Sequence, residues 1–436
     1  MRLRLSAQAE RFRASLFLLP TLAVVAAIVI ASVAIWIDSG LESSSSTLPL
    51  GFTSTVESAR ALLATIAGAT ITFAGIAFSV SLLIIQQASS QYSPRVVHTL
   101  FRDPFNRRVM SLVVGTFTYC LVILRSVRTA LEQGGDPVIP NLSVAIAVVL
   151  GIATILAIVA FIDHSAHAMD ISNILQDVED EAIAQVRRKW PDADPDTQPS
   201  PSSPPRPTDP AHTIKFDRSG WIQQLDEDKL TRCVPAGIIM WVNAYPGRYA
   251  VAGTPACFLS PAPDEPEVVA REVLASIGTG DTRTMQQDIS FGLRQLADVA
   301  LKALSPGIND PTTAQDAIFH TAALLGELLQ RNPPAPPEPH DDCGRVVLVH
   351  QPTHEDLIRL AFDEVRQAAA PMPAVCTYLL EALALLTAVV NEGPSDRRDA
   401  LRRQAELVVA GCAAADNLPA DLRDVEDAFQ ARFGFH

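Results

Sequence analysis

The sequence is poor in the residue patterns that support enzyme or metal chemistry. Cysteine occurs six times in 436 residues, without a Cys-x-x-Cys pair or a paired spacing to histidine. That usage fits reduced thiols better than disulfides or zinc ligands. The phosphate-binding Gly-rich loop, the Gly-x-Ser-x-Gly turn and the His-Glu-x-x-His helix are all missing from the sequence. We therefore expect neither enzyme activity nor a cofactor.

Charged residues are also scarce, at 19% of the chain, whereas hydrophobic residues reach 48%. A transmembrane helix needs roughly 20 apolar residues, with about 17 as the lower end. Four apolar runs come near or above this length: 15–36, 59–85, 109–124 and 142–162. The third is short unless it extends to Val127, with Arg125 and Arg128 reaching the headgroups. The sequence predicts four transmembrane helices.

The four runs contain no Asp, Glu, Lys or His. This disfavours a proton relay or a carrier with a charged site at the membrane midplane. The first run follows several basic residues, but it is too long for a secretory signal and a cleavage site is not evident before Asp38. We interpret it as an uncleaved anchor.

Arginine in the short loops predicts the orientation. Four arginines precede the first run and four lie in 86–108, whereas 38–58 holds none. By the positive-inside rule both termini are cytoplasmic in a bacterial inner membrane, although two arginines in 125–140 weaken the bias. Residues 1–165 hold 11 basic and 8 acidic residues, so a total net charge of −14 leaves −17 for the remainder. Such an acidic region does not attract nucleic acid.

Composition changes along the chain predict its domains. Eight prolines in 22 residues mark an extended linker, short strand patterns follow it, and helical periodicity dominates thereafter. The predicted fold is a mainly α membrane protein, with four spans plus a cytoplasmic region that contains a small β unit and a helical domain. The predicted parts are a transmembrane domain at 1–165, a stalk helix at 166–189, the linker at 190–211, the β unit at 212–260 and the helical domain at 261–436.

The second run carries a stripe of small and polar residues at helical spacing. It consists of Thr65, Gly68, Thr72, Gly75, Ser79 and Gln86. One interpretation is helix packing, where small residues let backbones approach and hydroxyls bond across. The other is a pore or substrate path lined by this helix in an oligomer, with Arg95 at its cytoplasmic mouth.

A second candidate lies in the segment RTMQQDISFGLRQLADVALKALSPGINDP. Its local chemistry indicates a tight helix corner, with Asp310 as the N-cap of the next helix and Pro311 in its first turn. The alternative is a ligand or ion pocket whose polar groups come from Arg283, Asp288, Asn309 and Asp310.

Two histidines, His164 and His167, follow the fourth run at a spacing that a metal could use. A juxtamembrane helix is more often simply polar where it enters water, and histidine also suits a pH-responsive contact. We do not expect a metal here, and the pair stays a weak candidate.

The motifs SSQYSPR (89–95) and ALSPGINDP (303–311) resemble a widespread bacterial family of predicted integral membrane proteins, catalogued as a domain of unknown function. The resemblance covers roughly 10–430. It implies an inner-membrane protein with four helices followed by a cytoplasmic region, and it implies no activity. The chain departs from the family pattern after the fourth span, where Asp163 and His164 stand in place of paired histidines.

As function we expect a homo-oligomeric channel or permeation protein with a regulatory cytoplasmic region. The alternative is a membrane-anchored sensor or scaffold whose cytoplasmic domain binds a ligand or a protein. The expected partners are the lipid bilayer and further copies of the chain. Copy number separates the two hypotheses, because a path along the stripe needs several copies around an axis.

Overall fold

The computed structural model of the chain describes residues 18–42, 56–91, 104–132, 141–167, 170–192, 210–334, 342–390 and 395–434. They form two compact units that divide between Asp170 and Ile171. The predicted fold class is confirmed, since most described residues are helical and the few strands lie in the C-terminal unit. Each unit is a structure of its own and is described separately.

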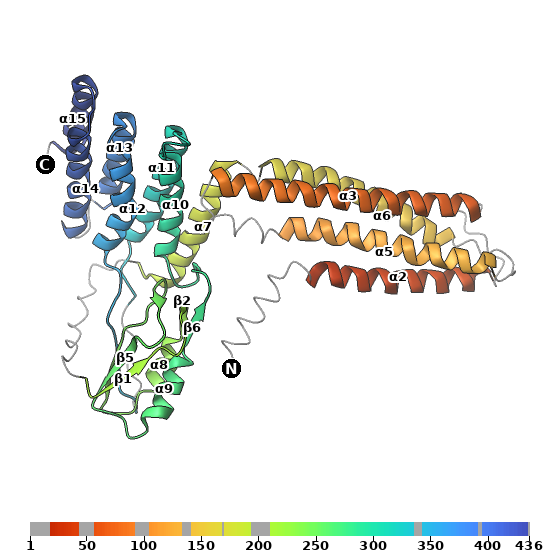
Figure 1. Cartoon of the computed structure of the whole chain (residues 1–436), viewed down its shortest axis with the longest axis horizontal. Coiled ribbons are helices and arrows are strands. Elements are labelled where there is room, and N and C mark those ends of the chain that lie inside the picture. Colours follow the sequence, from red (N-terminus) through yellow and green to blue (C-terminus); the bar gives the residue numbers. More distant parts are fainter. Residues whose placement is uncertain are drawn as a thin grey trace. The chain divides into compact units, whose positions relative to one another are not determined.

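In its described residues, the membrane unit has four long helices, each antiparallel to the one before it in the chain (Figure 1). They are α2 (Leu18–Glu42), α3 (Val56–Gln91), α5 (Pro104–Glu132) and α6 (Asn141–His167). Each contains a segment long and apolar enough to cross a membrane: Leu18–Ser39, Glu57–Leu83, Phe105–Val127 and Asn141–Ser165. The four predicted spans are confirmed, and the third does extend to Val127.

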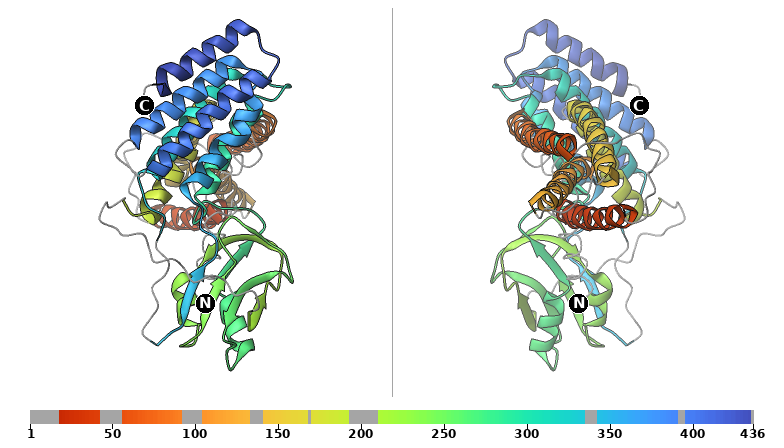
Figure 2. Two further views of the ribbon diagram at one scale, coloured as in Figure 1. Left: turned by 90° about the vertical axis from the view of Figure 1, so that its left-hand side faces the viewer. Right: turned by 90° about the vertical axis from the view of Figure 1, so that its right-hand side faces the viewer.

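Helix α5 lies at the centre of the bundle, against α2 and α6. Figure 2 shows the four helices nearly end-on. Tyr119 and Ile123 of α5 are fully buried together with Leu63 of α3. A second cluster towards the other end of the bundle contains Val113 of α5 and Phe161 of α6. The apolar interior therefore runs along most of the bundle.

The C-terminal unit contains two small sheets. One has the strand order β1-β5-β3-β7 and the other has the order β4-β2-β6, and all pairs are antiparallel except β3 with β7. The strands are β1 (His212–Lys215), β2 (Gly220–Leu225), β3 (Ile239–Val242), β4 (Tyr249–Ala250), β5 (Pro255–Ser260), β6 (Ile277–Gly280) and β7 (Arg345–Leu348). Helices α8 (Glu227–Arg232) and α9 (Pro266–Leu274) contribute Leu230 and Val273 to the common core.

The β unit is larger than the predicted range 212–260. Strand β6 pairs with β2, and β7 pairs with β3 although the two are about a hundred residues apart in the chain. Each of these two strands has four residues, and its partner lies in another part of the chain. Pairing between distant segments is set by tertiary structure, so the local sequence did not reveal it.

Seven further helices make up the helical part of this unit (Figures 1 and 2). They are α7 (Ile171–Lys189), α10 (Ser290–Ala303), α11 (Pro311–Leu329), α12 (His354–Ala369), α13 (Pro373–Val389), α14 (Ser395–Ala414) and α15 (Pro419–Phe433). Helix α10 begins at Ser290. The preceding residues are held on β2, where the Gln287 side chain bonds both the N–H and the C=O of Leu225 at 2.8 and 3.2 Å.

Helix α7, which lies within the range 166–189 predicted as a stalk helix, packs against α10 and α11. It buries five apolar residues at three- and four-residue spacing: Ile174, Leu175, Val178, Ala182 and Val186. Trp190 is also buried, and its carbonyl accepts a bond of 2.9 Å from Arg331. The first residues of the predicted linker are therefore part of the folded unit, whereas 193–209 lie outside the described residues.

Candidate functional site

Helix α3 presents two different faces. The packed face buries Ala59, Leu63, Ala67 and Ala77 against α5 and α6. Further contacts follow the same side of the helix: Phe73 meets Phe161 edge-on with ring centroids 6.4 Å apart, and Ile66 lies over Gly151. The packed face thus joins α3 to the bundle without using the polar stripe.

All six residues of the predicted stripe lie on the opposite face and are exposed in the single chain: Thr65, Gly68, Thr72, Gly75, Ser79 and Gln86. At 100° per residue, Thr72 lies about 180° around the helix from Leu63. A Cβ placed on Gly68 or Gly75 would meet no described atom of another element within 4 Å. Within the described chain, the two glycines are therefore uncovered notches on the surface of α3.

The hydroxyl groups of the stripe bond to their own helix. Thr65, Thr72 and Ser79 each donate to the carbonyl four residues earlier, at 2.7, 2.8 and 2.9 Å. These bonds satisfy the hydroxyl donors, so exposure to lipid costs less than the sequence suggests. Each oxygen keeps acceptor capacity towards whatever covers the face.

A different pair of hydroxyls bonds across the bundle. Thr116 of α5 and Thr154 of α6 are both about 1% exposed, and their hydroxyl oxygens are 3.0 Å apart. The sequence did not predict this pair, since it does not show which hydroxyl groups of two separate spans face each other.

Asp38 has a structural role that the sequence analysis also missed. Its carboxylate, near the end of α2, accepts bonds from the Leu142 N–H at 3.1 Å and from the Ser143 N–H and hydroxyl at 3.0 and 2.6 Å. It therefore caps the first turn of α6 from another helix. Tyr119 donates to the Ser143 carbonyl at 3.0 Å and ties α5 to the same turn.

Arg283 and Asp288 form a buried ion pair in the C-terminal unit. The guanidinium Nε and Nη2 lie 2.8 and 2.7 Å from Asp288 Oδ2, and the arginine also lies over the rings of Trp221 and Phe291. Burial raises the pKa of Asp288, and the positive charge of Arg283 opposes that rise. Gly247, with φ +88°, leaves room for the carboxylate. The pair joins the start of α10 to the β unit.

Asn309 and Asp310 lie beyond the other end of α10. Asp310 caps α11 by accepting from the Thr313 N–H at 3.1 Å and its hydroxyl at 2.6 Å, and Asn309 has a left-handed φ of 49°. Since the 14 residues of α10 span about 21 Å, the structure does not bring Arg283 and Asp288 together with this corner. The residues proposed for one pocket belong to two separate features.

His164 and His167 point to different partners. The ring of His164 packs on Phe105 with centroids 4.6 Å apart, and His167 Nδ1 lies 2.8 Å from the Asp163 carbonyl. Over the described part of the chain, the structure has no group of three or more His, Cys, Asp and Glu arranged to hold a metal. Arg95, the proposed mouth residue, lies outside the described residues.

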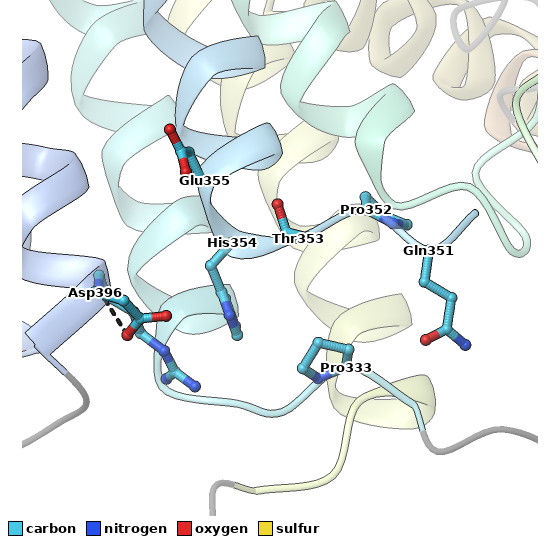
Figure 3. A pocket seen from close by; sticks show the side chains of 8 residues that line it. Pro333, Gln351, Pro352, Thr353, His354, Glu355 and Asp396 are labelled. Atoms are coloured by element: carbon cyan, nitrogen blue, oxygen red, sulfur yellow. Dashed lines mark hydrogen bonds between the residues drawn. The ribbon is translucent and has the colours of Figure 1, made fainter. Parts of the chain in front are cut away.

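The C-terminal unit has a cavity of about 460 Å³ where α12 and α14 begin (Figure 3). His354 lies in its wall with Nε2 2.9 Å from the Arg331 carbonyl. Arg397, almost fully buried, bonds the Leu329 carbonyl and also Asn332 Oδ1, the latter at 3.3 Å. Burial, then the charge of Arg397, lowers the pKa of His354. The sequence did not predict this cavity, because the residues that line it come from separate segments of the chain.

Comparison with known proteins gives a family. Residues 13–385 match the family described as "Predicted membrane protein (DUF2254)". The chain is 32% identical over 372 residues to the uncharacterized proteins Mb1321c of Mycobacterium bovis and Rv1290c of Mycobacterium tuberculosis, covering 83% of this chain and 69% of each relative. No solved structure matches the chain. With four spanning helices followed by the C-terminal unit, the chain belongs to this family of predicted membrane proteins.

Proposed function

We propose that several copies of this chain associate in the membrane through the α3 stripe and form a permeation path beside it. The observation that carries the proposal is the uncovered pair of glycine notches on α3, on the side opposite its packed face. Small residues at such spacing let a second helix approach closely in lipid, where packing rather than the hydrophobic effect drives association.

The chemistry of the stripe suits a path for neutral or weakly selected solutes. Its hydroxyl oxygens and Gln86 supply polar groups along one line, and the stripe itself carries no charge. Neutral hydroxyls and backbone dipoles do not bind ions tightly. An ion can therefore leave such a site as well as enter it, which a conducting path requires. Arg60, four residues after the start of α3 at Val56, adds positive charge at one end and favours anions there.

The first test is the mass of the assembled particle. One copy has a mass of 46.9 kDa, so the proposal expects a particle of several such masses in a lipid nanodisc. Gly75→Leu fills a notch and is expected to reduce the copy number. Ala160→Leu on α6, which enlarges another small exposed residue, is the matched control and should leave it unchanged. A wild-type particle with one copy would contradict the proposal.

The second test is flux through reconstituted liposomes, with chloride and potassium as probes. Gly75→Leu and Ser79→Leu are expected to abolish the flux of the wild-type protein, whereas Ala160→Leu keeps it. If a folded Gly75→Leu protein has the same flux as the wild type, the stripe does not line the path.

The cavity between α12 and α14 favours a second candidate, a membrane-anchored sensor. Its volume of about 460 Å³ suits a small ligand, and polar groups of Gln351, Thr353 and His354 line it (Figure 3). This candidate requires neither several copies nor flux. A single-copy particle without conductance would therefore favour it over the first proposal.

A further inference from the structure

We infer that a groove between α3 and α5 binds the phosphate of an anionic glycerophospholipid, with one acyl chain along the helices. The groove has a volume of about 590 Å³ and is open to the surroundings of the membrane unit. It lies between the start of α3 and the end of α5. These two helix ends are at the same end of the bundle, because the helices are antiparallel (Figure 1). The inference does not depend on the proposed path.

Two arginines stand at the headgroup level of this groove. Arg60 is three residues inside the start of the α3 span, and Arg125 is two residues before the end of the α5 span. At 1.5 Å per residue, both lie within about 5 Å of the span boundary. A guanidinium at this depth can extend to the interface, and its planar fork matches phosphate oxygens.

The groove becomes apolar one helical turn further into the membrane. Ala61 and Ala64 follow Arg60 along α3, and Leu121 and Leu124 precede Arg125 on α5. The alanines leave room beside α3, while the leucines offer apolar surface on α5. The order from water inwards is thus two cations and then an apolar channel, which is also the order of phosphate and acyl chain in a phospholipid.

The charges that face the groove favour an anionic lipid. Among the described residues that line the groove, Arg60 and Glu57 come from α3 and Arg125 comes from α5, and together they carry a net charge of +1. Glu57 precedes Arg60 on α3 and so lies further towards the end of the span. At that position its carboxylate can accept a hydrogen bond from a headgroup hydroxyl beyond the phosphate. A zwitterionic choline lipid gains less binding free energy from the two arginines, because its own choline group already balances the phosphate charge.

The test titrates the purified whole protein with phosphatidylglycerol and measures bound lipid by native mass spectrometry. The double variant Arg60→Gln/Arg125→Gln is expected to bind at least about tenfold more weakly, the loss that about 1.4 kcal/mol of charge-assisted bonding represents. Arg108→Gln, an exposed arginine at the other end of α5, is the matched control and should keep this binding event. Phosphatidylcholine is expected to bind more weakly than phosphatidylglycerol to the wild type.

A second variant keeps both arginines and fills the apolar part of the groove. Ala64→Leu is expected to weaken phosphatidylglycerol binding, whereas Ala160→Leu on α6 is not. This arm remains informative if the double arginine variant fails to fold. Binding that is unchanged in Ala64→Leu and in the folded double variant would overturn the proposal.

Competition with inorganic phosphate tests whether the groove binds a lipid or a free anion. At millimolar concentration it is expected to leave bound phosphatidylglycerol in place, since it lacks an acyl chain to fill the apolar part. Displacement of the lipid by inorganic phosphate alone would overturn the assignment to a lipid.

Discussion

At the scale of single residues, Arg283 and Asp288 show why chemically suggestive side chains are often structural. The Asp288 side chain is 3% exposed and the Arg283 side chain is 20% exposed, so the two charges face each other and are largely shielded from solvent. Their contacts reach Trp221 of β2 and Phe291 of α10. The pair therefore connects the sheet with the helical part of the unit.

We predict that Asp288→Ala lowers the free energy of unfolding of the C-terminal unit by about 3 kcal/mol, because it leaves a largely buried guanidinium unpaired. Glu364→Ala serves as the control: it breaks the ion pair with Arg294, but Glu364 is 54% exposed, so the expected loss is under about 1 kcal/mol. Urea unfolding followed by tryptophan fluorescence measures both. Equal losses would contradict the structural role of the buried pair.

Asp310 allows a similar distinction between a cap and a site. Asp310→Ala removes two bonds to Thr313 and is expected to destabilise the unit by about 1 kcal/mol. Asp310→Ser retains a side-chain acceptor and should restore most of that loss. A large loss of flux in Asp310→Ser at unchanged stability would instead indicate a functional site.

His354 gives the C-terminal unit a pH dependence with a defined sign. Its folded pKa lies below the ordinary value of 6.5 because of burial and Arg397, so the unfolded chain binds the proton more readily. Its contribution to stability is therefore complete above about pH 6.5 and is lost as the pH falls through the folded pKa. Unfolding at pH 7.5 and 5.5 should show a stability loss in the wild type that is smaller in His354→Gln. An equal loss in the variant would assign the effect to other groups.

At the scale of elements, α3 shows how much a helical pattern predicts. The spacing in the sequence identified the stripe, and the structure shows its six residues on the face that the bundle leaves uncovered. The sequence did not show that the hydroxyls bond within α3, since that depends on rotamers. It also did not show that Thr116 and Thr154 form a polar contact between α5 and α6.

Cysteine cross-linking tests the uncovered face of α3 directly. Under mild oxidation in membranes, Ser79→Cys is expected to link two copies if their stripes face each other, because disulfide formation needs Cα atoms within about 7 Å. Ala160→Cys on α6 should stay largely unlinked. Linking of both variants to the same extent would indicate random collision in the bilayer.

At the scale of the whole molecule, the two units differ in charge and surroundings. Residues beyond 165 carry a net charge of −17, while the membrane unit exposes apolar side chains around most of its surface, among them Ile152, Ile155 and Leu156 of α6. Membership of the membrane-protein family covers both units, since the match runs over 13–385. Both units are therefore candidates for the functional part of the protein.

The sequence by itself determined the four spans, the end of the third at Val127 and the cap of α11 at Asp310, because apolar length and capping residues act within a few helical turns. Tertiary structure alone decided the pairing of β7 with β3, the capping of α6 by Asp38, the separation of Asp288 from Asp310 and the cavity beside His354. The strand pairing, the cap and the cavity each join segments that are distant in the chain, so their geometry follows from how the whole unit packs rather than from local periodicity. The separation of Asp288 from Asp310 follows from the length of α10, which lies between them.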